Sequence, residues 1–270
     1  MEHISINPPD VSEREYEKAR FAVPHNILRS ELIYGEGFQS PGGLAAFKET
    51  VLPELALAPG RRLLDLGAGL GGAVFHLASE YEVEVVGIDS AEVMVTIATD
   101  RQERLDPKGS TRFLCGSIFS DELKPGSFDA IYCQDTLMYE VHKARTFARC
   151  TELLKPGGRL VINDFALGRS TPEVESYADV SGMQLVALPA YEEMAASAGL
   201  VDVTARDISS ETVRRLQSDL DQYLARTKKD TAIADADTRH LIERWHRKIR
   251  LIEAGGLAQA LVRADKPIRQ

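Results

Sequence analysis

The chain has 270 residues, which is long enough for one large α/β domain with additions and for a sizeable buried core. It is 44% hydrophobic and 27% charged, as globular proteins usually are, and its net charge of -9 argues against an extended nucleic-acid-binding surface. The three cysteines form no CxxC pair and have no histidine at metal-ligand spacing. We therefore expect no metal site, and buried reduced thiols at Cys115, Cys133 and Cys150.

The first residues, MEHISINPPDVSERE, lack the basic and apolar regions of a secretion signal. The sequence also contains no run of about 18 apolar residues, so we expect a cytoplasmic protein that does not enter a membrane. Residues 1–40 are expected to form an N-terminal arm or lid, with a helix from Ser12 to about Arg20.

From residue 41 onward, helix and strand patterns alternate along the chain. The helix patterns cover residues 43–57, 72–81, 92–105 and 143–154. The short apolar strands cover residues 62–66, 84–88, 112–115, 128–133 and 159–163. This alternation is typical of parallel strands joined by helical crossovers, whose ligands bind at the carboxyl ends of the strands.

The pattern changes after Ala166. It then predicts a short helix over 191–198, a strand over 200–205, long amphipathic helices over 209–226 and 237–254, and a last antiparallel strand over 258–264. The predicted fold is an α/β, doubly wound, mostly parallel seven-stranded Rossmann-like sheet formed by residues 41–270. Cap insertions are expected at about 166–190 and 209–255.

The loop after the first strand reads LDLGAGLGG and covers residues 64–72. Glycines there let the backbone turn tightly and let a ligand approach it closely. Asp65, just before the glycines, can accept hydrogen bonds from the loop or from a ligand ammonium through water. Asp89, at the end of the second strand, can accept from both hydroxyls of a ribose. Nicotinamide and flavin enzymes nearly share this pattern, although their usual fingerprint is GxGxxG.

Several segments together resemble the class I methyltransferases that depend on S-adenosyl-L-methionine (SAM). They are YGEGFQSPGG, LLDLGAGLGG, VVGIDSAEVM, SFDAIYCQDTLMY, LLKPGGRLVINDF and, more weakly, ERWHRKIRLIEAGG. The first and last point to the group of phosphoethanolamine, sarcosine and glycine N-methyltransferases. The resemblance covers roughly residues 34–256 and implies an enzyme that binds SAM and releases S-adenosyl-L-homocysteine (SAH).

By this resemblance, the amino-acid end of SAM would lie beside the glycine loop. Gln39 and Ser40 would lie near its carboxylate, and Gly67 and Gly69 would lie beneath it. Gln134, at the end of the fourth strand, would face the methionine part.

The nucleoside end would lie beside the second and third strands. Asp89 would bind the ribose, with Ser90 next to it. Where the family usually has an Asp that binds the adenine amino group, this chain has Ser117 followed by Ile118. The resemblance therefore implies a weaker adenine contact, or one made by the backbone.

Asp135 stands where relatives have their catalytic Asp. A carboxylate there can hold an ammonium group or take its proton, which frees the lone pair for in-line attack on the methyl group. The plain alternative is an Asp that caps a helix. Tyr139 replaces a family His; a phenol can orient an acceptor, but its pKa of about 10 makes it a poor base, and it could equally be a packing residue.

Other family contacts to the acceptor are altered. Phe165 replaces a Tyr, and the Arg and Tyr that bind phosphate are replaced by Ser181 and Met183. Lys248 remains as a candidate anion contact, or as a solvated helix lysine. One flexible ammonium lacks the bidentate support that Arg gives, so phosphoethanolamine is disfavoured. An amine with a hydrophobic body, or a carboxylate-bearing amine steered by Lys248, fits better.

Two residues of the arm complete the candidate substrate site. Tyr34 begins the first family segment, and His25 would reach the site if the arm folds over it, a surface histidine being the alternative. Trp245 is expected to anchor the late helix against the domain.

The leading interpretation is N-methylation of a small amine by direct methyl transfer. The alternatives are an O- or C-methyltransferase of a natural-product intermediate, an enzyme that rearranges SAM without an acceptor, and a binding protein without turnover. The expected partner is a small-molecule acceptor, without nucleic acid or membrane, and the expected state is a monomer or homodimer.

Overall fold

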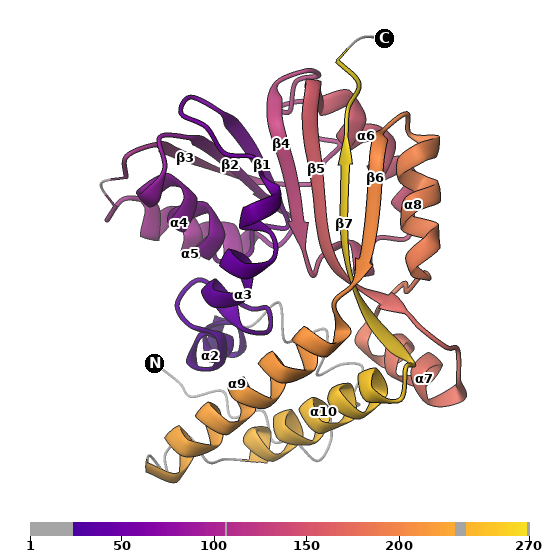
Figure 1. Cartoon of the computed structure of the whole chain (residues 1–270). Helices are drawn as coiled ribbons and strands as arrows, with labels where there is room; N and C mark the ends of the chain where they lie inside the picture. Colours follow the sequence, from indigo (N-terminus) through magenta and orange to yellow (C-terminus); the bar gives the residue numbers. More distant parts are fainter. Residues whose placement is uncertain (1–23, 106, 230–235, 269–270) are drawn as a thin grey trace.

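The computed structural model of the chain describes residues 24–105, 107–229 and 236–268 (Figure 1). The helix expected from Ser12 to about Arg20 lies outside these residues. The side chain of His25 is also outside the described part of the structure.

Seven strands form one sheet in the order β3-β2-β1-β4-β5-β7-β6. They are β1 (Arg62–Leu66), β2 (Glu84–Asp89), β3 (Ser110–Cys115), β4 (Phe128–Gln134), β5 (Leu154–Leu167), β6 (Val201–Asp207) and β7 (Leu257–Asp265). The first five are parallel, whereas β7 lies antiparallel between β5 and β6. The predicted seven-stranded, mostly parallel sheet is therefore confirmed, including its antiparallel last strand.

The described helices alternate with these strands and extend beyond them. They are α2 (Pro24–Tyr34), α3 (Gly43–Glu49), α4 (Gly72–Glu80), α5 (Glu92–Gln102), α6 (Lys143–Leu153), α7 (Pro172–Ser181), α8 (Leu188–Ser197), α9 (Ser209–Lys229) and α10 (Ala236–Glu253), with short 3-10 helices η1 (Leu52–Glu54) and η2 (Leu137–Tyr139). The helix expected over 43–57 is thus divided into α3 and η1. Helices α2 and α7 were not expected.

The two faces of the sheet are buried by different helices, because successive side chains of a strand point to opposite faces. Leu64, Val86 and Ile131 belong to a core cluster that includes residues of α6 and α8. Their neighbours Leu63 and Val85 pack instead in a cluster with residues of α3 and α4. Strands covered on both faces read as continuous apolar runs, which is why these short runs were recognisable in the sequence.

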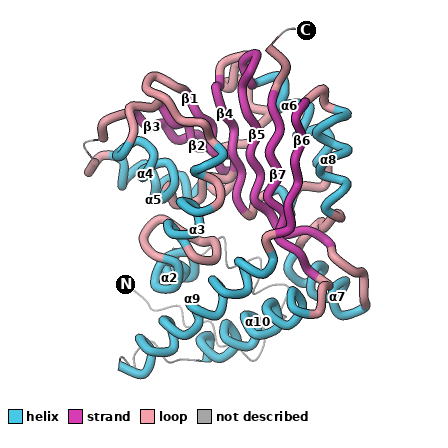
Figure 2. Tube along the Cα trace, viewed as in Figure 1, coloured by secondary structure: helices cyan, strands magenta, loops and turns pink. Residues whose placement is uncertain are grey.

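A third apolar cluster lies beyond the carboxyl ends of β4 and β5. Helices α9 and α10 run side by side there, as Figure 2 shows, and α2 and α7 are at the same end of the molecule. Trp245 of α10 is buried in this cluster, between Tyr34 of α2 and Tyr223 of α9, at ring distances of 5.7 and 6.4 Å. These helices close the end of the sheet at which a ligand is expected.

Within the described ranges, no helix is both long and apolar enough to span a bilayer. The same residues contain no group of three or more side chains that could hold a metal ion.

Candidate active site

A cavity of about 560 Å³ lies at the carboxyl ends of β1, β2 and β4, under α2 and α10. Most of the residues predicted to form the site line it: Tyr34, Gln39, Ser40, Asp65, Gly67, Gly69, Asp89, Ser90, Gln134, Asp135, Tyr139, Phe165 and Lys248. These residues come from six separate regions of the sequence. The strand order brings them together, because in an open α/β sheet the ligand crevice lies where neighbouring strands lead to opposite faces.

The glycine loop is fixed by its neighbours on both sides. Gly67 has a φ of 84°, in the left-handed region, and a Cβ there would lie 2.1 Å from Oγ1 of Thr136. The backbone N–H of Gly69 donates to Oδ2 of Asp89 at 2.9 Å, and that of Ala91 donates to Oδ1 at 2.9 Å. The Asp89 carboxylate therefore joins the ends of β1 and β2 while it faces the cavity.

Asp65 is buried beneath this loop. The hydroxyl of Tyr132 on β4 donates to its Oδ2 at 2.9 Å. Burial raises the pKa of Asp65 to about 7, with the Tyr132 hydrogen bond opposing the shift and the charge of Asp89 adding to it. Its charge thus changes near neutral pH, which makes it sensitive to a cation bound in the cavity.

The segment from Gly37 to Ser40 lies against the glycine loop. The N–H of Gly72 donates to the carbonyl of Gly37 at 3.1 Å. A Cβ on Gly69 would lie 3.0 Å from Oε1 of Gln39, so the Gln39 amide lies against the glycine loop.

Asp135 lies at the end of β4 with a φ of 50°, which is unusual for a residue other than glycine. Its N–H donates to the carbonyl of Asn163 at 2.8 Å, and its Oδ1 accepts from Nε2 of Gln259 at 3.0 Å. Burial raises the pKa of Asp135, while hydrogen bonds from Gln259 and Ser40 and the charge of Lys248 oppose the shift. Ser40 is thus hydrogen-bonded to the carboxylate of Asp135.

Cations line the cavity as well. Lys248 of α10 places its Nζ 4.6 Å from the ring centre of Phe165, which is only 1% exposed. Arg29 of α2 and Arg244 of α10 also line the cavity and were not predicted. Arg244 precedes Lys248 by four residues, so the two lie on one face of the helix, a spacing that the sequence already contained.

Two predicted adenine contacts do not line the cavity. Ser117 is exposed, and its Oγ accepts from the N–H of Phe119 at 3.3 Å. Ile118 is buried in the core cluster beneath α6. Ala91, and Met94 of α5, do line the cavity and were not predicted.

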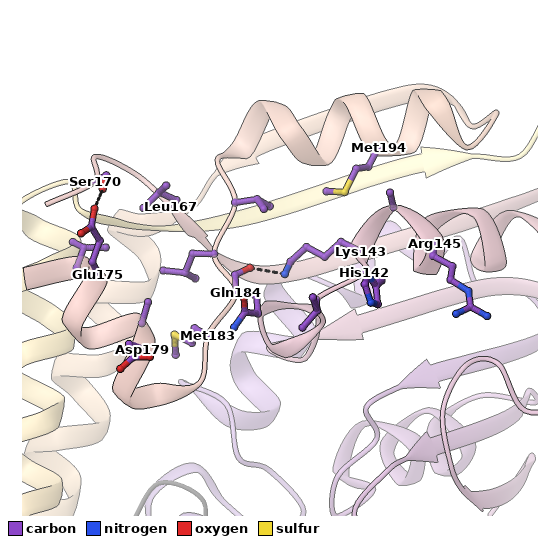
Figure 3. Close-up of a pocket in the computed structure, with 16 residues that line it drawn as sticks. His142, Lys143, Arg145, Leu167, Ser170, Glu175, Asp179, Met183, Gln184 and Met194 are labelled. Atoms are coloured by element: carbon purple, nitrogen blue, oxygen red, sulfur yellow. Dashed lines mark hydrogen bonds between the residues drawn. The ribbon is translucent and has the colours of Figure 1, made fainter. Parts of the chain in front are cut away.

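Met183 lines a different cavity, of about 1030 Å³, between α6, α7 and α8 (Figure 3). There the Nζ of Lys143 donates to the carbonyls of Gln184 and Glu140. The C-terminal part of α7 separates the two cavities: Asp179 lines both, while Ser181 lines the cavity that contains Asp135.

The sheet order, the antiparallel β7 and the glycine loop bonded to the carboxylate that ends β2 are those of the class I SAM-dependent methyltransferases. Residues 57–229 match the family described as methyltransferase domain, and the chain belongs to that family. The predicted class and fold are therefore confirmed.

Two relatives of the chain are phosphoethanolamine N-methyltransferases. Phosphoethanolamine N-methyltransferase 1 of Arabidopsis thaliana is 34% identical over 83% of this chain and 45% of its own length. Phosphoethanolamine N-methyltransferase of Plasmodium falciparum is 27% identical over 82% of this chain and 84% of its own length. The chain thus spans about half the length of the plant relative.

A solved structure shares the fold. Phosphoethanolamine N-methyltransferase 2 of Haemonchus contortus, in complex with phosphomonomethylethanolamine and SAH, superposes with a TM-score of 0.87 at 24% identity. The superposition covers 97% of this chain and 61% of that protein.

Proposed function

We propose that this chain binds SAM in the 560 Å³ cavity and transfers its methyl group to the nitrogen of a small amine. The observation that supports this most directly is the pair of carboxylates in one cavity, Asp89 at the end of β2 and Asp135 at the end of β4. Only β1 lies between these strands, so their ends are about 10 Å apart. This separation suits a nucleoside on one carboxylate and an acceptor on the other.

SAM supplies a methyl group on a positively charged sulfur. Asp89 would accept hydrogen bonds from the ribose, and the glycine loop would lie against the amino-acid part with Asp65 beneath it. Asp135 would hold the acceptor ammonium and take its proton, and Tyr139 would orient the acceptor by hydrogen bonding. Catalysis then comes chiefly from holding the nitrogen in line with the methyl group in a cavity that excludes water.

The acceptor we propose is an amine that carries an anionic group. Three cationic side chains, Arg29, Arg244 and Lys248, line the cavity that contains Asp135. Arginine is well suited to bidentate contacts with carboxylate or phosphate, so the two arginines supply what a lone lysine lacks. The phosphomonomethylethanolamine of the Haemonchus contortus structure is one compound of this kind.

Mass spectrometry of SAM turnover over a panel of amino acids, phosphorylated amines and neutral amines tests this function. We expect SAH and an N-methylated product from a zwitterionic amine, and a loss of about 100-fold or more in the variant Asp135→Ala, which keeps the cofactor site. Equal turnover by the variant would remove Asp135 from the mechanism. Turnover of neutral amines alone would contradict the anionic acceptor.

An O- or C-methyltransferase is the second candidate, because Tyr139 lines the cavity where a histidine base would be expected by resemblance. The position of the new methyl group in the product distinguishes these reactions. Release of methylthioadenosine without an acceptor would instead indicate rearrangement of SAM. We also propose that the protein is cytoplasmic and that it is a monomer or a homodimer. Light scattering on the purified protein measures its oligomeric state.

A further inference from the structure

Gln259 lies next to Asp135 although 124 positions separate them in the sequence. It belongs to β7, the antiparallel strand beside β5, where it pairs with Phe165 (Figure 1). Its side chain is 3% exposed, and its neighbours in the strand are mostly buried aliphatic residues. A buried amide in such a strand calls for polar partners, because an unpaired one is costly.

Both hydrogens of the Gln259 amide have partners. Nε2 donates to Oδ1 of Asp135 at 3.0 Å and to Oδ1 of Asn163 at 2.7 Å. An ionised carboxylate only accepts hydrogen bonds, so this orientation of the amide suits ionised Asp135, whereas the flipped amide would place two oxygens together. The amide donor therefore favours the ionised form of Asp135, because a charged oxygen accepts the stronger hydrogen bond.

The backbone of Gln259 is fixed as well. Its N–H donates to Oγ of Ser209 at 2.9 Å, and its carbonyl accepts from the N–H of Ile208 at 2.8 Å. Asp135, in turn, has a left-handed backbone and is bonded through its N–H to the carbonyl of Asn163. Asn163 thus contacts both partners, and the three residues form one connected unit across β4, β5 and β7.

Several charged or titratable groups face Asp135 from the elements around it. Lys248 of α10 lowers the pKa of Asp135, as do the hydrogen bonds from Gln259 and Ser40. Asp164 of β5 is fully buried, and its carboxylate accepts a hydrogen bond from the hydroxyl of Tyr191 on α8. Burial and the charge of Asp135 raise the pKa of Asp164. Gln259 is the foremost of the groups that offset the burial of Asp135.

We propose that Gln259 is a positioning residue for the acceptor: its amide holds the Asp135 carboxylate ionised and directed into the cavity, ready for an ammonium group. This inference rests on the proposed function, because it assigns Gln259 a part in the methylation of an amine.

The variant Gln259→Met removes both donors and keeps the length of the side chain. Gln102→Met is the matched control, since Nε2 of Gln102 donates to the carbonyl of Thr111 on the distant edge strand β3. Each protein is labelled with ¹³C at the aspartate carboxyls and titrated by NMR, and the Asp135 signal is assigned from its loss in Asp135→Asn. We expect the Asp135 midpoint to rise by about one to two pH units in Gln259→Met and to stay unchanged in the control.

An unmoved Asp135 midpoint in Gln259→Met would overturn the proposal. If that variant does not fold, Gln259→Glu is measured instead; it keeps the reach but replaces the donors with a carboxylate, and the same upward shift is expected. In assays with the amine acceptor, the acid limb of kcat/KM should move with the midpoint. A merely structural role would lower the rate equally at every pH, which also contradicts the proposal.

Calorimetry with SAH separates this inference from the proposed function. The wild type and both Gln259 variants should bind SAH with similar affinity, because Gln259 does not line the cavity around the glycine loop. Failure of the wild type to bind SAH would contradict the proposed function. Binding by all three with an unmoved Asp135 midpoint would contradict only the role of Gln259.

Discussion

Among the glycines of the loop over residues 64–72, Gly67 is the one at which an added Cβ would have the nearest neighbour. A Cβ there would lie 2.1 Å from Oγ1, 2.5 Å from Cγ2 and 2.7 Å from Cβ of Thr136, so rotation of the Thr136 side chain cannot relieve the clash. Gly126 also has a positive φ, of 64°, but a Cβ there meets nothing within 4 Å. An alanine at either position would have a strained backbone, but only the alanine at position 67 would also clash with a neighbour.

We expect Gly67→Ala to lower the free energy of unfolding by about 1–3 kcal/mol more than Gly126→Ala, because only the first is overpacked. Urea unfolding of both variants measures this difference. Equal losses would show that the loop moves away from Thr136 at little cost.

Because the pKa of Asp65 is raised, we predict that cofactor binding depends on pH. Its pKa of about 7 in the folded protein lies above the usual value of about 3.9, so the protein is destabilised by this group as pH rises from about 4 to 7. A bound ammonium group favours the ionised carboxylate. SAH affinity should therefore rise about tenfold from pH 6 to pH 8, with protons released on binding near pH 6.

Calorimetry in buffers of different ionisation enthalpy measures both the affinity and the released protons. In Asp65→Asn the affinity should be nearly constant over this range. A wild-type affinity that does not change with pH would place the ammonium group elsewhere.

Single residues of the candidate cofactor site were predictable where a motif fixes the backbone. Gly67, Gly69 and Asp89 follow from strand ends and glycine spacing, and all three line the cavity. Gln259 and Arg244 were not predictable in this way, because each reaches the site from a late element whose place is set by tertiary packing. The one local signal for Gln259 was a polar residue within an apolar strand.

Among the elements, α2 lines the cavity and is joined to α5 by an ion pair. Nη1 and Nη2 of Arg101 donate to the two carboxylate oxygens of Glu31 at 2.6 and 2.8 Å, and Glu31 also accepts from the N–H of Gly37. The side chains of the pair are only 19% and 13% exposed. Bidentate geometry and partial burial make this pair stronger than a typical surface pair.

Arg101→Met should therefore loosen α2. We expect amide hydrogen exchange in this helix to accelerate about 5- to 30-fold, which corresponds to 1–2 kcal/mol. The matched control is Arg112→Met, because Arg112 pairs with Glu122 at 53% exposure on both sides. Unchanged exchange in Arg101→Met would mean that apolar contacts, such as those of buried Ile27 with Leu70 and Met94, hold α2 alone.

The strands were easier to predict than the helices. Each predicted strand occurs within a few residues of its expected bounds. The central strands β1, β2 and β4 are buried over most of their length, and burial on both faces selects continuous apolar runs. The helix expected over 43–57 ends early because Pro53 lacks an N–H and restricts the residue before it. Helix α7 has two ordinary start signals: Thr171 caps the helix by accepting from the N–H of Val174, and Pro172 is its first residue. It was nevertheless not predicted, because few of its positions are apolar.

For the whole molecule, the position of the site follows from the order of the sheet. Strands β1 and β4 are neighbours, and the chain crosses from one face of the sheet to the other between them, so the crevice opens at their carboxyl ends. The sequence predicted this end of the sheet, but it did not predict how α2, α9 and α10 enclose it. That enclosure depends on long-range packing around Trp245.

The central claim is that the cavity beside the glycine loop binds SAM, and titration calorimetry with SAH tests it most directly. We expect one SAH per chain, and an affinity at least about tenfold lower in Asp89→Ala but unchanged in Asp100→Ala, whose residue is exposed on α5. Absence of heat with both SAM and SAH, while a nicotinamide or flavin dinucleotide binds, would contradict the claim.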